Sequence, residues 1–299
     1  MQMPSYTYEE FPENMSTTKG MKIIYGQDEI GIQCLPDTVY AVKDGMELHV
    51  KMMFPREVNE RKKYPTIFHV QGSAWFKQNM NSSMGNLSPL VRAGYGVVLI
   101  EYRFAPQHRF PCQVEDGKTA VRFVMEHATE YPIDTNNIFL SGDSSGGHTA
   151  MMMMATWESM ECDAEKTPLP KLNACIDLYG SVNLLTMNRA LSAYDHDAMD
   201  SPATNYLGFS APTDPKETVR RMPHSYITET TPLPPVLIMH GSKDRTVPFT
   251  QSMEFYQHLK ACGKDVVFYK VKNADHGGNV FYCRATMQVI VDFLNAHLQ

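Results

Sequence analysis

The chain has 299 residues, of which 43% are hydrophobic and 10% aromatic, so it can bury a large core. Its formal net charge of -6 comes without the basic excess or basic stripe of a nucleic-acid-binding surface, so we expect no nucleic-acid partner. No stretch approaches the roughly 18 consecutive apolar residues that a membrane helix needs, so we expect no membrane partner either.

The first residues and the cysteines bear on location. Residues 1–11 are polar and acidic and lack the basic start and apolar run of a secretory signal. The six cysteines are scattered without a CxxC pair, which is typical of reduced thiols. These observations predict a cytoplasmic protein, unless a leader has been removed.

The predicted elements begin with a hairpin. Two strand-like runs, 37–42 and 46–54, flank the turn signal Lys43-Asp44-Gly45, which predicts an antiparallel pair at a sheet edge. From residue 65 onward, short apolar runs alternate with helical patterns, as in a parallel sheet that helices cover on both faces. With the hairpin they make a mostly parallel, eight-stranded sheet, and the runs predicted as parallel strands are 66–70, 97–102, 138–141, 174–179, 236–239 and 266–271.

Helical spacing of apolar residues predicts helices over 113–131 and 287–298. The segment from about 181 to 231 has no strong period and contains four prolines. A structureless loop of this length is rare in a compact domain unless it has a function. We therefore predict a single α/β domain over 1–299 with a cap insertion at about 181–231, above the strand ends where open parallel sheets bind ligands.

The sequence Gly142-Asp143-Ser144-Ser145-Gly146 fits the pattern G-x-S-x-G. It lies between a predicted strand and an apolar helix, which is the context of a nucleophile elbow. Only Ser144 has glycines two positions away on both sides, so Ser144, and not Ser145, is the predicted nucleophile. The backbone N–H of Ser145 is then expected to contribute to the oxyanion hole.

A second loop follows the predicted strand at 66–70. Many esterases carry a His-Gly-Gly-Gly loop here, whose backbone amides complete the oxyanion hole. In this chain the loop is Gln71-Gly72-Ser73-Ala74-Trp75, so small residues remain and the N–H of Gly72 or Ser73 is expected to donate. Trp75 is interpreted as a packing residue beneath the site, with a substrate contact as the alternative.

Two further residues complete a predicted catalytic triad. Asp244 follows the strand at 236–239 and a glycine turn, where it would fix the histidine tautomer and stabilise the imidazolium. His276 lies in a glycine-containing loop after the last predicted strand, and the order Ser, Asp, His is the one that α/β hydrolases use. The alternative for Asp244 is a helix cap, and His148, close to the elbow, is interpreted as structural.

No metal or cofactor is predicted. Asp195-His196-Asp197 comes nearest to a ligand cluster, but the polarity of a solvated loop explains it better. The chain also has no glycine-rich phosphate loop of the P-loop or Rossmann type.

With these motifs placed, the chain resembles known esterases. Glu101-Tyr102-Arg103-Phe104-Ala105-Pro106 and Gly142 to Gly147 are similar to the hormone-sensitive-lipase-like esterases. The loop from Gln71 to Trp75 and the stretch Asp195-His196-Asp197-Ala198-Met199-Asp200-Ser201-Pro202 resemble the bifunctional feruloyl and acetyl-xylan esterases. The resemblance covers most of the chain after about residue 37. It implies an α/β-hydrolase fold, the triad Ser144, Asp244 and His276, and a cap that lines the substrate pocket, for which Trp75, Asp200 and Ser201 are the candidates.

The predicted function is therefore a serine carboxylesterase that removes acetyl or feruloyl groups from plant cell-wall, xylan-type oligosaccharides through an acyl-enzyme. The expected partner is a small-molecule or oligosaccharide ester, and a homo-oligomer is left open. One alternative is a prolyl-oligopeptidase-type peptidase or amidase, which shares the catalytic layout but usually carries a large N-terminal propeller. The other is a non-catalytic binding protein of the same fold, which usually lacks a triad member.

Overall fold

The computed structural model describes residues 6–7, 9–26, 29–56 and 62–299. Within these residues, nine strands form one mixed sheet in the order β1-β3-β5-β4-β6-β7-β8-β9, with β2 paired to β3. The strands are β1 Gly31–Cys34, β2 Thr38–Lys43, β3 Met46–Arg56, β4 Tyr64–Val70, β5 Gly96–Ile100, β6 Ile133–Asp143, β7 Ala174–Leu178, β8 Val236–Gly241 and β9 Val266–Val271.

The directions of the strands confirm the predicted hairpin and the parallel sheet. β2 and β3 are antiparallel, with Lys43 opposite Met46 across the predicted turn, whereas β4 to β9 pair in parallel. The predicted count of eight strands is one too low, because β1 also pairs antiparallel with β3. Its four residues, two partly buried and two exposed, are too short a run to show a period, so pairing with β3 determines its strand conformation.

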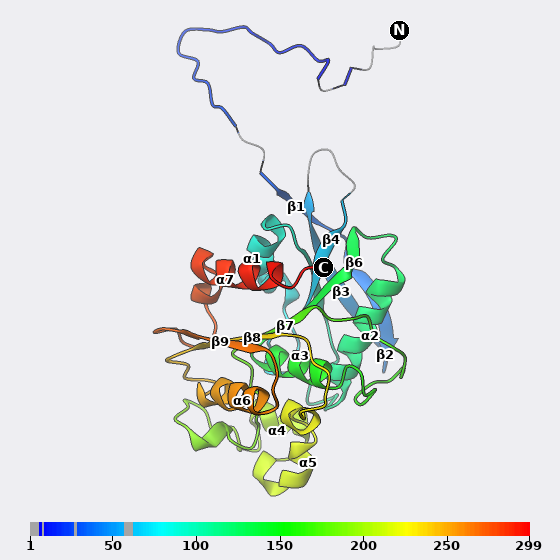
Figure 1. The fold of residues 1–299 in the computed structure, drawn as a ribbon, viewed down its shortest axis with the longest axis vertical. Helices are drawn as coiled ribbons and strands as arrows, with labels where there is room; N and C mark the ends of the chain where they lie inside the picture. The colour runs from blue at the N-terminus through cyan, green and yellow to red at the C-terminus, as the bar shows by residue number, and fades with distance from the viewer. Residues whose placement is uncertain (1–5, 8, 27–28, 57–61) are drawn as a thin grey trace.

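Helices cover both faces of the sheet (Figure 1). On one face α1 (Met80–Arg92) and α7 (Arg284–Asn295) bury Leu87, Leu90 and Ile290 in one hydrophobic cluster. The other face is covered by α2 (Cys112–Glu126), α3 (Ser145–Ala155) and α6 (Thr250–Ala261), which contribute to a second cluster. Burial of each large apolar side chain stabilises such a layer by about 1.5–3 kcal/mol. The sheet is therefore the rigid middle layer of a three-layer fold.

The segment between β7 and β8 contains short elements instead of a strand. It forms α4 (Pro202–Leu207), α5 (Pro215–Val219) and the 3-10 turns η1 Met187–Arg189, η2 Ala211–Thr213 and η3 Pro223–Tyr226. Each of the two α-helices has proline in its first turn and a side-chain N-cap. The Ser201 side chain accepts the Thr204 N–H in α4, and the Asp214 side chain accepts the Glu217 N–H in α5. In Figure 1 they lie at the end of the molecule away from the N-terminal segment.

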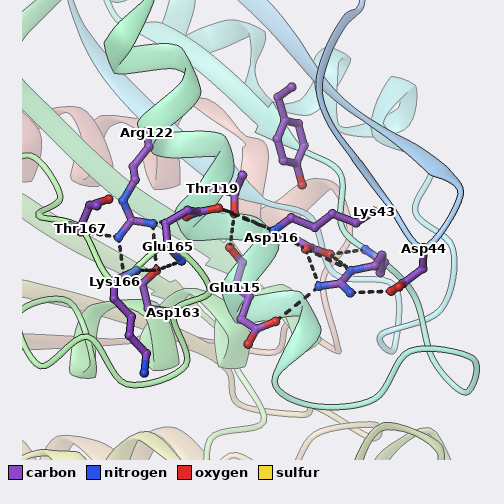
Figure 2. A network of polar contacts seen from close by, with 12 residues as sticks. Lys43, Asp44, Glu115, Asp116, Thr119, Arg122, Asp163, Glu165, Lys166 and Thr167 are labelled. Carbon is purple, nitrogen blue, oxygen red and sulfur yellow. Dashed lines mark hydrogen bonds and ion pairs between the residues drawn. The ribbon is translucent and has the colours of Figure 1, made fainter.

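A buried ion network joins the N-terminal hairpin to α2 (Figure 2). Asp116 of α2 is fully buried and accepts hydrogen bonds from Nε and Nη2 of Arg103 at 2.9 and 2.8 Å. The hairpin turn supplies Lys43, 3.2 Å from Asp116, and Asp44, 2.7 Å from Arg103. Bidentate pairing makes such a buried charge tolerable, and removing one partner would leave the other uncompensated. The hairpin and α2 are thus fixed to each other.

No helix within the described residues is both long enough and apolar enough to cross a lipid bilayer.

Candidate active site

The turn between β6 and α3 holds Ser144 in a strained conformation. Its φ of 52° and ψ of -124° lie outside the regions that residues with a side chain favour. The turn packs so closely that a Cβ on Gly146 would lie 2.1 Å from the carbonyl oxygen of Val70, and one on Gly142 would lie 2.2 Å from that of Gly146. Both glycines of the G-x-S-x-G pattern are therefore required by backbone contact. The turn directs the Ser144 side chain away from the sheet.

Ser144, His276 and Asp244 meet although they are far apart in the sequence. His276 Nε2 lies 2.8 Å from Ser144 Oγ, and His276 Nδ1 lies 2.7 Å from Asp244 Oδ2. Because the carboxylate accepts the Nδ1 proton, the Nε2 lone pair faces the serine hydroxyl. The arrangement can therefore transfer a proton from Ser144 to His276.

The carboxylate of Asp244 is buried and well supported by hydrogen bonds. Oδ1 accepts the backbone N–H groups of Thr246 at 2.9 Å and Val247 at 2.8 Å. Oδ2 pairs with His276 Nδ1 at 2.7 Å, and His240 Nε2 lies 3.1 Å from it. Burial on its own raises the pKa of Asp244, but the hydrogen bonds from His240 and His276 outweigh it and lower the pKa to about 2. Asp244 is thus ionised whenever the imidazole can act as a base.

The amides predicted for the oxyanion hole are already in use. The Gly72 N–H donates to Asp143 Oδ1 at 2.9 Å, and the Ser73 N–H donates to Ser145 Oγ at 3.0 Å, so neither points into open space. This corrects the expectation for Gly72 and Ser73, whose amides hold the loop instead. The N–H groups of Ala74 and Ser145 have no acceptor within the described residues, and Ala74 lines the cavity next to Ser144. These two amides are the available donors.

The side chain of Ser145 fixes the loop that carries Ala74. Its hydroxyl oxygen accepts the N–H of Ser73 at 3.0 Å and that of Trp75 at 3.1 Å, one on either side of Ala74. Ser145 itself is 2% exposed, so the loop is anchored to a rigid helix start. The left-handed φ of 54° at Ala74 is part of this tight loop.

A cavity of about 390 Å³ opens beside the Ser144 hydroxyl. Polar side chains dominate its walls, and no aliphatic side chain larger than alanine lines it in the described part of the chain. Asp143 and His276 are the ionisable groups apart from two tyrosines. The lining residues are Gln71, Gly72, Ser73, Ala74, Ser82, Ser83, Asn86, Asp143, Ser144, Tyr179, Thr246, His276, Gly277, Gly278 and Tyr282.

The three predicted pocket residues do not line this cavity. Trp75 is 3% exposed and stacks on Tyr206 at a ring-centroid distance of 4.3 Å, which agrees with its interpretation as a packing residue. Ser201 caps α4 by accepting the N–H of Thr204 at 3.1 Å, and Asp200 is exposed to solvent. The motif that contains Asp200 and Ser201 therefore shapes the segment between β7 and β8 without reaching Ser144.

That segment is nevertheless tied to the triad loop. The Ala193 N–H donates to the Arg245 carbonyl at 2.7 Å, and Ser192 Oγ and His196 Nε2 bind the Thr246 carbonyl at 3.1 and 2.9 Å. Burial is the largest influence on His196 and lowers its pKa. The neighbouring carboxylates Asp195 and Asp197 both accept the side-chain amide of Asn188, at 2.7 and 2.8 Å. All of these polar groups are thus accounted for by protein contacts.

Several site residues were missed by the sequence reasoning. Tyr179 lies directly after β7, with its ring 4.9 Å from that of His276, and its hydroxyl is 3.3 Å from that of Tyr282. Tyr179 follows the end of β7 as Asp244 follows the end of β8, and this feature of the sequence could have indicated that Tyr179 lies at the site. Tyr282 and the α1 residue Asn86 gave no signal, because nothing local relates them to the cavity.

The comparison with protein families agrees with this geometry. Residues 53–259, well over half of the chain, match the family model described as BD-FAE. The chain belongs to the BD-FAE family. The matched range contains Ser144 and Asp244 and ends before His276, which the structure supplies from the loop after β9.

Individual relatives are esterases by name. The chain is 27% identical over 231 residues to the esterase LipC of Mycobacterium tuberculosis, covering 72% of this chain and 53% of the relative. It spans about half the length of the curated relatives it matches.

Solved structures share the fold. A truncated carbohydrate esterase from gut microbiota superposes with a TM-score of 0.78 at 23% identity, covering 91% of this chain and 98% of that one. A bifunctional GH43-CE protein of Bacteroides eggerthii gives 0.77 at 24% identity, covering 89% and 38%. The fold is therefore that of the α/β-hydrolase esterases.

Proposed function

We propose that this protein is a serine carboxylesterase that works through an acyl-enzyme. The observation that carries the proposal is the continuous hydrogen-bonded chain from Ser144 Oγ through His276 to Asp244, with both distances under 3 Å. The names of the relatives support ester hydrolysis, and the open cavity next to Ser144 gives a substrate access to the hydroxyl.

In the proposed mechanism, Ser144 Oγ attacks the ester carbonyl carbon while His276 Nε2 takes its proton. The carbonyl oxygen becomes an oxyanion, which accepts hydrogen bonds from the N–H groups of Ser145 and Ala74. His276 then protonates the leaving alcohol as the C–O bond breaks, leaving the acyl group on Ser144. A water molecule, deprotonated by His276, repeats the sequence and releases the acid. Asp244 stays ionised and stabilises the imidazolium throughout.

For the substrate, we propose acetyl or feruloyl esters of carbohydrates. A cavity that binds a long acyl chain would expose aliphatic side chains, because apolar surface has to be removed from water to gain affinity. Here hydroxyl and amide side chains such as Ser83 and Asn86 form one wall, and Tyr179 and Tyr282 form part of another. Hydroxyls and amides match the hydroxyls of a sugar, and the tyrosine rings can face either a sugar or a feruloyl ring. The segment 181–231 would act as a cap through its hydrogen bonds to Thr246, which lines the cavity.

The test compares wild type with Ser144→Ala on p-nitrophenyl acetate, methyl ferulate, acetylated xylo-oligosaccharides and p-nitrophenyl decanoate. We expect wild type to cleave the short and carbohydrate esters and to be labelled by a fluorophosphonate probe. Ser144→Ala should lose turnover by several orders of magnitude with an unchanged circular dichroism spectrum.

Two results would contradict the proposal. Retention of esterase activity and labelling by Ser144→Ala would refute the nucleophile. Higher kcat/KM on the decanoate than on every carbohydrate ester would refute the substrate class while leaving the esterase assignment in place. A proline-specific amide serves as the negative substrate, and its cleavage in preference to all the esters would point to a peptidase instead.

A further inference from the structure

Asp244 Oδ2 has a second histidine partner behind the triad. His240 Nε2 lies 3.1 Å from Asp244 Oδ2, and the His240 side chain is fully buried near the end of β8. The sequence reasoning used this strand end to locate Asp244 but gave His240 no role. Its position, four residues before the acid, brings its ring to the same carboxylate oxygen that His276 binds.

The contacts of the His240 ring determine which nitrogen carries the proton. Nε2 makes its hydrogen bond to the carbonyl oxygen of Val247 at 2.9 Å, and Asp244 Oδ2 lies 3.1 Å away as a second contact of the same N–H. Both of these oxygens only accept. Nε2 must therefore be the donor. Nδ1 lies 2.7 Å from Ser252 Oγ on α6, whose hydroxyl can donate to it. Phe249 packs edge-on against the ring with centroids 5.5 Å apart, so the ring has little freedom to turn.

We propose that His240 is a positioning residue of the triad, which holds the Asp244 carboxylate in register with His276 and shares the negative charge of Oδ2. The inference rests on the proposed function. The amides of Thr246 and Val247 bind Oδ1, so His240 is the contact besides His276 that the structure gives for Oδ2.

Loss of His240 would have two consequences. The carboxylate would gain freedom to rotate, which lowers the fraction of molecules in which His276 is aligned with Ser144. The charge on Oδ2 would also be shared with one donor fewer, so it would stabilise the protonated His276 more strongly. A protonated imidazole cannot act as the base, so the acid limb of the pH–rate profile would move to higher pH.

Other groups also face His276, and a His240 variant leaves them in place. They come from the elbow, from the end of β7, from the segment between β7 and β8, and from the two flanking loops. Arg245 binds the Asp275 carboxylate at 2.7 Å, so that charge is partly neutralised next to His276. The titratable and charged groups are Asp143, Tyr179, His196, Asp244, Arg245, Asp275 and Tyr282.

The test measures kcat and KM for p-nitrophenyl acetate between about pH 5 and pH 9 in wild type, His240→Leu and His240→Gln. His240→Leu should lower kcat by about 10- to 100-fold, since misalignment acts on the transition state, with KM changed by less than about twofold. Its acid limb should lie about 0.5 to 1 pH unit higher than in wild type. His240→Gln places an amide donor where Nε2 was, and it should recover most of kcat and the wild-type limb.

His148→Leu is the matched control. His148 is also fully buried, but its Nε2 binds the Arg221 carbonyl at 2.9 Å and it does not contact Asp244. The control should lose stability without moving the acid limb. An equal shift in His148→Leu, or equal defects in His240→Leu and His240→Gln, would overturn the positioning role. A His240→Leu enzyme with wild-type kcat and an unshifted limb would overturn it as well.

Nitrogen NMR of the wild-type histidine rings decides the question if the leucine variant does not fold. A protonated Nε2 with an unprotonated Nδ1 on His240 supports the proposal, and the opposite tautomer overturns it. Failure of the proposed function would be seen separately, as an absence of fluorophosphonate labelling in wild type. If wild type is labelled and hydrolyses esters, and His240→Leu has the same kcat and the same pH–rate profile as wild type, only the role of His240 is refuted.

Discussion

Replacing Ser145 with alanine would test how the oxyanion loop is held. The substitution leaves the backbone N–H of Ser145 in place but removes the oxygen that accepts the N–H groups of Ser73 and Trp75 at 3.0 and 3.1 Å. An unsatisfied buried donor costs about 1–3 kcal/mol. Trp75 is buried and Ser73 is partly exposed, so water can compensate only Ser73. The unpaired Trp75 donor and the lost Ser73 hydrogen bond, which contributes about 1 kcal/mol, should together lower the stability by about 2–4 kcal/mol.

Both stability and turnover report on this change. Thermal unfolding should shift down by roughly 3–6 °C for a chain of this size. Because Ala74 lies between the two released amides, its N–H would no longer be fixed, and kcat on p-nitrophenyl acetate should fall about tenfold or more. Ser88→Ala is the control, since its hydroxyl binds the Gly85 carbonyl within α1 and does not contact the loop. If Ser145→Ala matched wild type in both Tm and kcat, the anchoring role of its side chain would be wrong.

Three further changes test other parts of the structure. Gly146→Ala should abolish activity and destabilise the fold by at least about 1–3 kcal/mol, since its methyl would lie 2.1 Å from the Val70 carbonyl. Gly85→Ala, in the exposed interior of α1 with no atom within 4 Å, should instead gain up to about 1 kcal/mol in urea unfolding. Burial raises the pKa of Asp177 to about 7, so the free energy of unfolding of wild type falls as pH rises from about 4 to 7. The stability of Asp177→Asn should therefore increase relative to wild type by on the order of 2–3 kcal/mol between about pH 5 and 8. A stability difference that calorimetry finds to be the same at every pH would contradict this. Asn86→Leu should lower kcat/KM about 2- to 10-fold on acetylated xylo-oligosaccharides while leaving that on p-nitrophenyl acetate unchanged, and equal effects on both would count against a sugar contact.

The sequence predicts the positions of Ser144, Asp244 and His276 at strand ends because each is tied to a local pattern. The G-x-S-x-G turn, the strand followed by a glycine turn, and the loop after the last strand each place a residue at the same edge of the sheet. The structure then brings these three side chains within hydrogen-bonding distance. The roles of Ser144 as nucleophile, His276 as base and Asp244 as its partner are part of the proposed ester hydrolysis.

The oxyanion loop and the cavity wall could not be predicted in the same way. Whether the Ser73 or the Ala74 amide is available depends on where Ser145 Oγ lies, and this oxygen comes from a turn 72 residues further along the chain. The helix α1 was missed because its sequence is rich in asparagine and serine and contains Pro89. Its helical conformation is supported by tertiary packing of Leu87 and Leu90 rather than by propensity.

The segment that matches the family model, residues 53–259, depends on residues outside it, because the buried ion network includes Lys43 and Asp44. A truncated protein that kept only residues 53–259 would lose His276 and β9 at one end and the hairpin turn at the other. Arg103 and Asp116 would remain, but without the charges of Lys43 and Asp44 that complete their surroundings. The region of sequence similarity is therefore shorter than the domain that holds the triad and the ion network. The ends of a truncated protein should be chosen from the contacts in the structure and not from the aligned region.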